Sequence, residues 1–429
     1  MSHSKALITT IQSGAYDDRF ARLYGEENVD TARARYIDAV HGFLDTFGEP
    51  QSALALFSAP GRTEIGGNHT DHNHGCVLAG SVNLDVIAIV AFNDGDTVRV
   101  KSKGYDMDTV SLSDLAVKDS EINRSASLIR GTAARFAQLS YHIGGFDAYT
   151  TSNVLKGSGL SSSAAFEVLI GCILSHGYND GAVSAVEIAQ IAQYTENVYF
   201  GKPSGLMDQM ASSVGNIITI DFKDTDTPVI EQVNVDFAAA GHALCIVDVG
   251  GNHADLTHEY AAIPAEMKAV ANTLGGKVLR DISPDTFYAN IPTLRQKHGD
   301  RAVLRAIHFY EENDRVAAEV AALRAGDFNT FLQLIIASGN SSFEYLQNIY
   351  ANVDVTDQGM SLALAIAQKA LGGRGAYRVH GGGFGGTTQN FVPLDMLPTF
   401  KATIEAIFGE GSCHILRIRP YGGICVDKI

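Results

Sequence analysis

The sequence lacks several features that mark particular classes of protein. Its five cysteines are scattered and form no CxxC pair, so no disulfide framework is expected. No apolar run approaches about 18 residues, which argues against a membrane-spanning helix. The N-terminus has no basic stretch followed by an apolar one, so no signal peptide is expected. We therefore expect a soluble cytoplasmic protein with reduced core thiols and no membrane partner.

Basic residues are also in deficit. The chain has 32 Lys and Arg against 48 Asp and Glu, which gives a formal net charge of -16. Such a surface repels phosphate backbones, so nucleic acid is not expected as a partner. A local basic pocket for a nucleotide is still compatible with this charge. The sequence does not indicate an oligomeric state.

What the chain does have is typical of a globular protein. Hydrophobic residues make up 45% of its 429 residues and charged residues 19%. The length favours two domains, and the charged, turn-rich stretch 221–228 is the best candidate boundary. Strands and helices are mixed without regular βαβ spacing, so two domains of α+β type are expected. Strands are predicted at 53–60, 84–92, 242–249, 376–380 and 390–394, and helices at 126–139, 164–174, 185–197, 259–273, 311–326 and 358–371.

Two glycine-rich segments are candidate phosphate sites. Lys156–Ala164 reads KGSGLSSSA, and its glycines and the following helix N-terminus favour an anion. It lacks GxxxxGK[ST], so it is not a P-loop, and the alternative is a serine-rich cap on a core helix. Gly381–Gly386 reads GGGFGG and contains GxGxxG, but no acidic residue lies about 20 positions further on, so a Rossmann site is not indicated. A tight structural turn or the wall of a phosphate site remain alternatives.

Polar residues gather in two further places. Arg62–Asn73 reads RTEIGGNHTDHN and lies between two apolar strands, which favours a ligand-binding loop. Its His69, Asp71, His72 and His74 could instead bind a metal, although their spacing does not match a helical HxxxH pair. Glu196 and Asp208 could converge on a cation and a hydroxyl, or be plain surface charges.

Taken together and in this order, these segments resemble the galactokinase branch of the GHMP small-molecule kinases. The family's first motif reads GRVNLIGEHTDYN, where Gly61–Asn73 reads GRTEIGGNHTDHN. Its motifs GLSSSA and GGGFGG stand unchanged at Gly159–Ala164 and Gly381–Gly386, and its GLMDQ segment also matches. The resemblance therefore extends over most of the chain, and three ordered motifs are more specific than any one alone.

The resemblance implies an α+β, two-domain GHMP kinase fold. An N-terminal α/β domain, residues 1–222, and a C-terminal α+β domain, residues 223–429, would enclose the active site in the cleft between them. The implied activity is ATP-dependent phosphorylation of the C1 hydroxyl of galactose or a close galactose-like sugar. Its products are the sugar 1-phosphate and ADP, and Mg²⁺ is the expected cofactor.

The resemblance also assigns roles to individual residues. Asp208 and Arg62 would be catalytic, with Arg62 lowering the pKa of Asp208, which acts as a base or mainly orients the sugar. Ser163 and Glu196 would bind Mg²⁺. The ATP-binding residues would be Gly157, Ser158, Gly159, Leu160, Ser161, Ser162 and Ser163, and the sugar-binding residues Glu64, Asn68, His69, Asp71, Gly205 and Tyr260.

The chain departs from the family pattern within Arg62–Asn73, the segment that should hold the sugar and is called the sugar loop below. Asn68 stands where the family has Glu and Glu64 where it has Asn, so the two residue types have changed places. His72 replaces Tyr, and the family's DYEVS segment has no clear match, with SSFEYLQN at 341–348 in its expected position. The exchange could preserve sugar recognition or alter it.

Three rival functions follow from these residues. A galactokinase-like sensor would bind sugar and ATP without turnover, although intact Asp208, Arg62 and Ser163 favour an enzyme. Another GHMP kinase would act on a substrate such as N-acetylgalactosamine or a uronic acid. A metal hydrolase built on the histidines is the most distant alternative.

Overall fold

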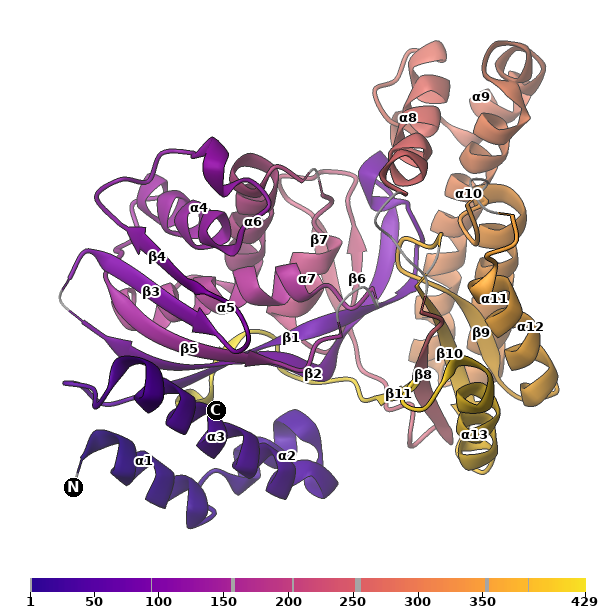
Figure 1. Ribbon diagram of the computed structural model, residues 1–429. Helices are drawn as coiled ribbons and strands as arrows, with labels where there is room; N and C mark the ends of the chain where they lie inside the picture. Colours follow the sequence, from indigo (N-terminus) through magenta and orange to yellow (C-terminus); the bar gives the residue numbers. More distant parts are fainter. Residues whose placement is uncertain are drawn as a thin grey trace.

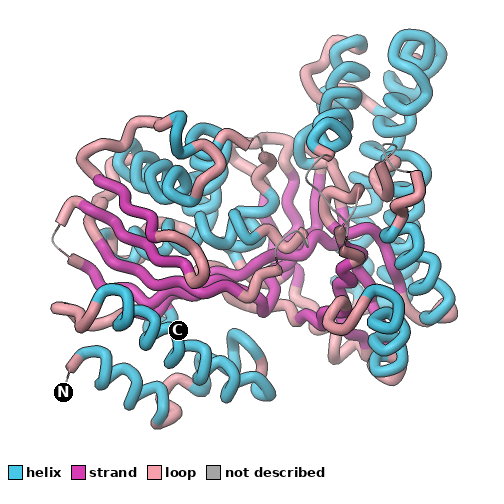
Figure 2. The backbone as a smooth tube through the Cα atoms, viewed as in Figure 1, coloured by secondary structure: helices cyan, strands magenta, loops and turns pink. Residues whose placement is uncertain are grey.

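Two packed sheets organise the chain. The computed structural model describes residues 2–93, 95–155, 159–202, 204–250, 256–351, 355–384 and 386–429. Within these residues the strands form one eight-stranded and one four-stranded sheet, each carrying its own helices (Figures 1 and 2). This is the mixed, two-domain architecture expected from the sequence.

The larger sheet is almost wholly antiparallel, with one parallel pair formed by β3 and β5. Its main path runs β12 (Ile424–Cys425), β1 (Ala55–Gly66), β2 (Cys76–Phe92), β5 (Phe146–Ser152), β3 (Thr97–Ser102) and β4 (Met107–Ser111), while β6 (Ile217–Asp221) pairs with β2 and with β7 (Val229–Val233). The long strands β1 and β2 form its centre and carry the sugar loop between them.

Strand β2 buries both of its faces because alternate side chains point to opposite sides of a sheet. Ile87 and Ile89 pack on the first helical layer, and Ala88 and Val90 on the second. The first layer consists of α1 (His3–Gln12), α2 (Asp17–Tyr24) and α3 (Val29–Phe47), and the second of α4 (Ser125–Gln138), α5 (Ser162–Tyr178), α6 (Ala185–Thr195) and α7 (Met207–Val214). Figure 1 shows the two layers on opposite faces of the sheet.

The smaller sheet is fully antiparallel, in the order β11 (Cys413–Leu416), β8 (His242–Asp248), β10 (Thr387–Pro393) and β9 (Ala376–His380). On one face, Val247 packs on α12 (Gly359–Leu371) and α13 (Leu397–Phe408). On the other, Ile246 belongs to a core that includes α11 (Phe328–Ser341), part of α10 (Ile291–Ala325) and residues of the larger sheet. The remaining helices α8 (Thr257–Thr273) and α9 (Pro284–Ala289) pack with α10.

The chain changes sheet later than the charged stretch suggested. The boundary expected at residues 222 and 223 falls between β6 and β7, which pair with each other in the larger sheet. Polar turn residues here mark a hairpin and not a linker. The chain enters the smaller sheet only at β8, and its end returns to the larger sheet, where Cys425 pairs with Phe57.

The remaining sequence-based elements mostly match the structure. The helices predicted at 126–139, 164–174 and 358–371 are confirmed, whereas 311–326 is only the second half of α10. All five cysteines are free. Among the described residues, no helix combines the length and apolarity that a membrane span needs.

Candidate active site

An arginine–aspartate pair occupies the centre of the site. Arg62 lies in β1, and Asp208 lies in the first turn of α7. Nε and Nη2 of Arg62 lie 2.7 and 2.6 Å from the same oxygen, Oδ1 of Asp208. Burial raises the pKa of Asp208, but the Arg62 charge and hydrogen bonds from Ser161 and Arg62 outweigh it, and the pKa falls below its usual value. Asp208 is therefore ionised at neutral pH, with a quarter of its side chain, 26%, still exposed.

The segment before α5 is fixed to this pair. The Arg62 backbone N–H donates to Leu160 O at 3.0 Å, and the guanidinium donates to Gly159 O. Ser161 adopts a left-handed φ of 55° and does not cap α5 with its side chain. The start of the helix, where unpaired N–H groups favour an anion, therefore has no side-chain cap from this residue. Ser162 and Ser163 begin the helix, whereas Gly157 and Ser158 lie outside the described residues.

Ser163 and Glu196 lie together, as a shared metal site requires. Ser163 Oγ donates to Glu196 Oε1 at 3.2 Å. The Lys202 ammonium lies 3.1 Å from the same oxygen, which shows that the position accepts a cation. A hydroxyl and a carboxylate are oxygen donors of the kind Mg²⁺ takes, so these two residues fit the ion. Among the described residues no group of three His, Cys, Asp or Glu side chains forms a metal site.

Half-buried residues of the sugar loop lie against the turn that precedes Asp208. Asp71 faces Gly205 so closely that any side chain at position 205 would overlap Asp71 Oδ2. Burial and the neighbouring Asp208 charge raise the pKa of Asp71 to about 6. Burial lowers the pKa of His69 and, more strongly, that of His72, so both rings are neutral at pH 7.

Glu64 near the end of β1 and Asn68 in the loop itself are buried and touch each other. Asn68 Nδ2 donates to Glu64 Oε1 at 2.9 Å, and Arg378 Nη2 donates to the same oxygen at 2.9 Å. The exposed fractions of Glu64 and Asn68 are 3% and 0%. Sugar contact by either residue stays a prediction, and in this structure both side chains bond to protein atoms.

Strand β1 runs further into this region than its polarity indicated. The sequence placed Arg62 and Glu64 in a polar loop, yet β1 continues to Gly66. Both charged side chains are buried in the strand because Asp208 and Arg378 pair with them. Such partners, 146 and 314 positions away, cannot be read from local pattern.

The glycine-rich segment of the second domain closes the site. Tyr260 in α8 donates its hydroxyl to Gly383 O at 2.8 Å, and its ring packs edge-on against Phe384. His69 Nε2 donates to Gly382 O at 2.9 Å. Thus His69, Asp71, Gly205 and Tyr260 gather where the two domains meet, beside Arg62 and Asp208.

Three further residues belong to the site and were missed from the sequence. Gln209 donates to Glu196 Oε2 at 2.7 Å and to Glu167 Oε2 at 3.2 Å, so it links the two carboxylates. Glu167 lies one helical turn after Ser163, and burial raises its pKa well above the usual value. Lys202 is the third. The only available signals were the i, i+4 spacing of Glu167 and the position of Gln209 next to Asp208.

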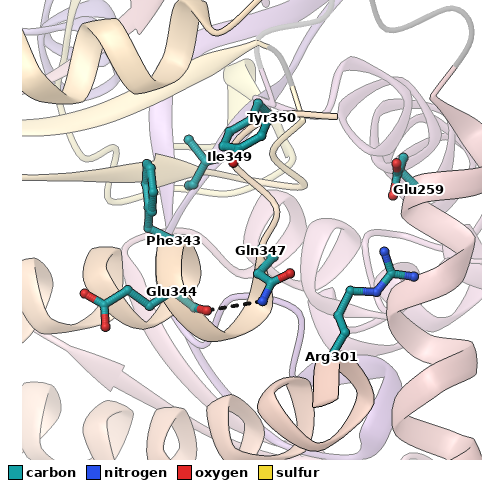
Figure 3. A pocket seen from close by; sticks show the side chains of 7 residues that line it. All are labelled: Glu259, Arg301, Phe343, Glu344, Gln347, Ile349 and Tyr350. Carbon is teal, nitrogen blue, oxygen red and sulfur yellow. Dashed lines mark hydrogen bonds between the residues drawn. The ribbon is translucent and has the colours of Figure 1, made fainter. Parts of the chain in front are cut away.

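A separate hollow of about 470 Å³ opens on the second domain (Figure 3). Its polar walls include Glu259 of α8 and Arg301 of α10, and Gln347 and Ile349 also line it. None of the residues predicted from the sequence as part of the site lines this hollow.

Comparison with known proteins identifies the chain's family. Residues 41–92 match the galactokinase galactose-binding signature, and residues 127–216 match the GHMP kinases N terminal domain. The chain is 32% identical over 364 residues to a galactokinase of Actinobacillus pleuropneumoniae, covering 83% of this chain and 89% of that protein. The chain belongs to the galactokinase family.

Other relatives agree with this assignment. A galactokinase of Streptomyces coelicolor is 30% identical to this chain over 382 residues. The match covers 88% of this chain and 94% of the Streptomyces protein. The crystal structure of a Lactococcus lactis galactokinase complexed with galactose superposes with a TM-score of 0.77 at 25% identity, covering 90% of this chain and 98% of that one. A Methanococcus jannaschii mevalonate kinase shares the fold alone, with a TM-score of 0.61 at 14% identity over 86% of this chain and 99% of that one.

Proposed function

We propose that this member of the galactokinase family transfers the γ-phosphoryl group of ATP to the C1 hydroxyl of galactose. The observation that carries the proposal is the partly buried Arg62–Asp208 pair beside the N-terminus of α5, which Ser161 does not cap with its side chain. In the proposed complex Asp208 would face the acceptor hydroxyl, and the N-terminus of α5 would face the phosphate groups of ATP. A sensor without turnover would not need this pair, so an enzyme is favoured. The proposed compartment is the cytoplasm, consistent with five free thiols.

In the proposed reaction the protein mainly positions charge. Phosphoryl transfer passes through a loose transition state, so alignment and neutralisation supply most of the catalysis. The N–H groups at the start of α5 would bind phosphate oxygens. Asp208 is ionised and would accept a hydrogen bond from the C1 hydroxyl, then take its proton as the bond to phosphorus forms. Its lowered pKa makes it a weak base, so orientation is the larger part of its role.

Ser163 and Glu196 would hold Mg²⁺ together with the nucleotide. When bound, the ion supplies charge neutralisation on the phosphate groups. Lys202 would have to leave Glu196 Oε1 for the ion to bind there, and it would then be free to face phosphate oxygens. His69, Asp71, Gly205 and Tyr260 are the proposed sugar contacts.

One assay tests the proposed function. ADP release should require both Mg²⁺ and galactose, and ³¹P and ¹³C NMR of the product should place the phosphate on C1. N-acetylgalactosamine, galacturonate, talose and glucose serve as competing acceptors. Absence of sugar-stimulated ADP release, or a phosphate on C6, would refute the proposal.

Replacing Ser163 with Ala should shift the Mg²⁺ requirement to higher concentration, because one of the oxygen ligands is lost. The measurement is a Mg²⁺ titration at saturating galactose and constant ATP, repeated as a Mn²⁺-binding titration by electron paramagnetic resonance. Ser175→Ala removes a buried hydroxyl further along the same helix and should leave both titrations unchanged. Coinciding curves for Ser163→Ala and the wild type would remove Ser163 from the metal site.

Acidification should lower kcat/KM for galactose at pH values where the protein is still folded. The pKa of Asp71 is raised to about 6, so below that pH the carboxyl group is protonated, loses its charge and accepts a hydrogen bond from a sugar hydroxyl more weakly. We expect kcat/KM for galactose to fall as pH drops through about 6. The raised pKa of Asp71 affects the free energy of unfolding in the opposite direction. Its stabilising contribution is fully present below the pKa of Asp71 in the unfolded chain and is lost as pH rises through about 6.

The measurement is kcat/KM at saturating ATP across this range, with circular dichroism at each pH. Asp71→Asn should show lower kcat/KM at pH 7.5 and no inflection near pH 6. An inflection that persists in Asp71→Asn belongs to another group.

A further inference from the structure

The glycine-rich segment turns carbonyl groups toward the sugar loop. Gly381 O accepts from Asn68 Nδ2 at 2.7 Å and Gly382 O accepts from His69 Nε2 at 2.9 Å. Gly383 O accepts from Tyr260. Three consecutive carbonyl oxygens therefore bind side chains, and a phosphate would be repelled on this side. The segment therefore binds the sugar loop through Gly381 O and Gly382 O, and α8 through Gly383 O.

Asn68 has no polar side-chain capacity left for a ligand. A primary amide offers two N–H donors and one oxygen that accepts two bonds. The two donors go to Glu64 Oε1 and Gly381 O. The oxygen accepts from Asn348 Nδ2 at 2.8 Å and from Ser342 Oγ at 3.2 Å. Because Asn68 is also fully buried, a sugar hydroxyl could bind it only by displacing one of these bonds.

Asn348 joins the two segments that Asn68 touches. Its Nδ2 donates to Asn68 Oδ1 and, at 3.2 Å, to Gly382 O. Its backbone oxygen accepts from Phe384 N at 2.6 Å. A side chain at position 383 would overlap that oxygen, and Gly383 has a φ of 83°, so only glycine fits this approach. Asn348 is fully buried, although its neighbours Gln347 and Ile349 line the open hollow (Figure 3).

We propose that Asn68 and Asn348 are a pair of positioning residues that hold the sugar loop against the glycine-rich segment, and that Asn68 does not itself bind the sugar. The pair fixes His69, the next residue, on Gly382 O and so sets the direction of the loop toward Asp71. The proposal rests on the proposed function, because it assumes that galactose binds beside Asp71. It assigns discrimination among sugars to the half-buried loop residues His69 and Asp71 and not to position 68.

A substrate–enzyme cycle distinguishes positioning from contact. Dissociation constants are measured by calorimetry for galactose and for its 2-, 3-, 4- and 6-deoxy analogues, with wild type and Asn68→Ala. We expect Asn68→Ala to weaken binding about 10-fold, as for loss of a buried hydrogen bond, and by the same factor for every sugar. A penalty that vanishes for one deoxy sugar would show that Asn68 contacts the missing hydroxyl, and would overturn the proposal.

Asn348→Ala provides the second variant, because it leaves three of the bonds to the Asn68 side chain intact. It should give the same uniform penalty, and Asn68→Ala/Asn348→Ala should be less than additive since the two residues share a bond. Asn390→Ala is the matched control: Asn390 is a fully buried asparagine of the smaller sheet whose amide donates to Thr388. Its galactose affinity should stay within about 2-fold of wild type. Additive penalties, or an equal loss in Asn390→Ala, would overturn the pair.

Amide hydrogen exchange tests the Asn68–Asn348 pair independently of the proposed kinase activity. Without any ligand, residues 67–73 should exchange faster in Asn348→Ala than in wild type or Asn390→Ala. Unchanged exchange there refutes the positioning role. If the wild type fails to bind galactose while exchange accelerates as expected, the proposed function falls and the positioning pair stands.

Discussion

Replacing Asp208 with Asn is expected to lower kcat by at least about 100-fold while ATP affinity changes no more than a few-fold. The amide keeps the size of the side chain but cannot take the proton of the C1 hydroxyl. It also removes the negative charge that holds Arg62 at 2.6 Å, so the reacting groups lose alignment together. ATP binding depends on the segment before α5, which Arg62 still holds through its backbone N–H and Leu160 O.

The variant is compared with Asp221→Asn. Asp221 also pairs with an arginine, Arg280 at 2.7 Å, and has a similar exposure of 35%, but lies outside the site. Its kcat should match wild type within 2-fold or so. Steady-state kinetics and nucleotide titration give the two readouts. Preserved turnover with lost ATP binding in Asp208→Asn would contradict the assignment.

Replacing Arg378 with Met should reduce the free energy of unfolding by about 3–5 kcal/mol, the range for removing one partner of a buried ion pair. Arg378 is fully buried and donates to Glu64 Oε1 and to Ile65 O. Glu312 and Glu319 are both buried nearby. Burial and the Glu312 charge raise the pKa of Glu319 well above its usual value, and the Arg378 charge opposes this rise. Burial also acts to raise the pKa of Glu312, but the charges of His308, Arg315 and Arg378 outweigh it and the pKa is lowered. Methionine would leave this group of carboxyl side chains short of one positive charge.

Arg374→Met is the control for Arg378→Met. Arg374 pairs with Asp395 at 2.9 Å on the surface, where the side chains are 59% and 63% exposed. Its removal should cost no more than about 1 kcal/mol. Urea denaturation followed by circular dichroism measures both variants. Equal midpoints for the two variants would mean that the Arg378 charge contributes little to stability.

The motif residues of the site were predictable because they belong to the ordered motifs of a family, although the paired residues are far apart in the sequence. Ser163 and Glu196 do meet, and Arg62 and Asp208 do pair. Local periodicity likewise located α4, α5 and α12. In each case the side-chain pattern and the tertiary environment favour the same structure.

The rest depended on contacts that no local pattern reveals. Glu64 appeared to be a loop carboxylate because its compensating charge, Arg378, comes from a strand of the other domain. Asn348 lies in a segment that did not match the family, so nothing connected it with Asn68. The end of the larger sheet was missed for a similar reason, since β12 consists of only two residues, Ile424 and Cys425.

The return of the chain's end to the larger sheet has a consequence for biosynthesis. Cys425 pairs with Phe57 of β1, and the buried Arg419 lies 3.0 Å from Asp85 of β2. Because translation proceeds from the N-terminus, Phe57 and Asp85 are not covered until the codons for residues 419–425 have been read. On the ribosome β1 therefore remains an open edge strand beside a buried carboxylate with one cation missing. Nascent chains stalled just before Arg419 should be the form most prone to pair with one another.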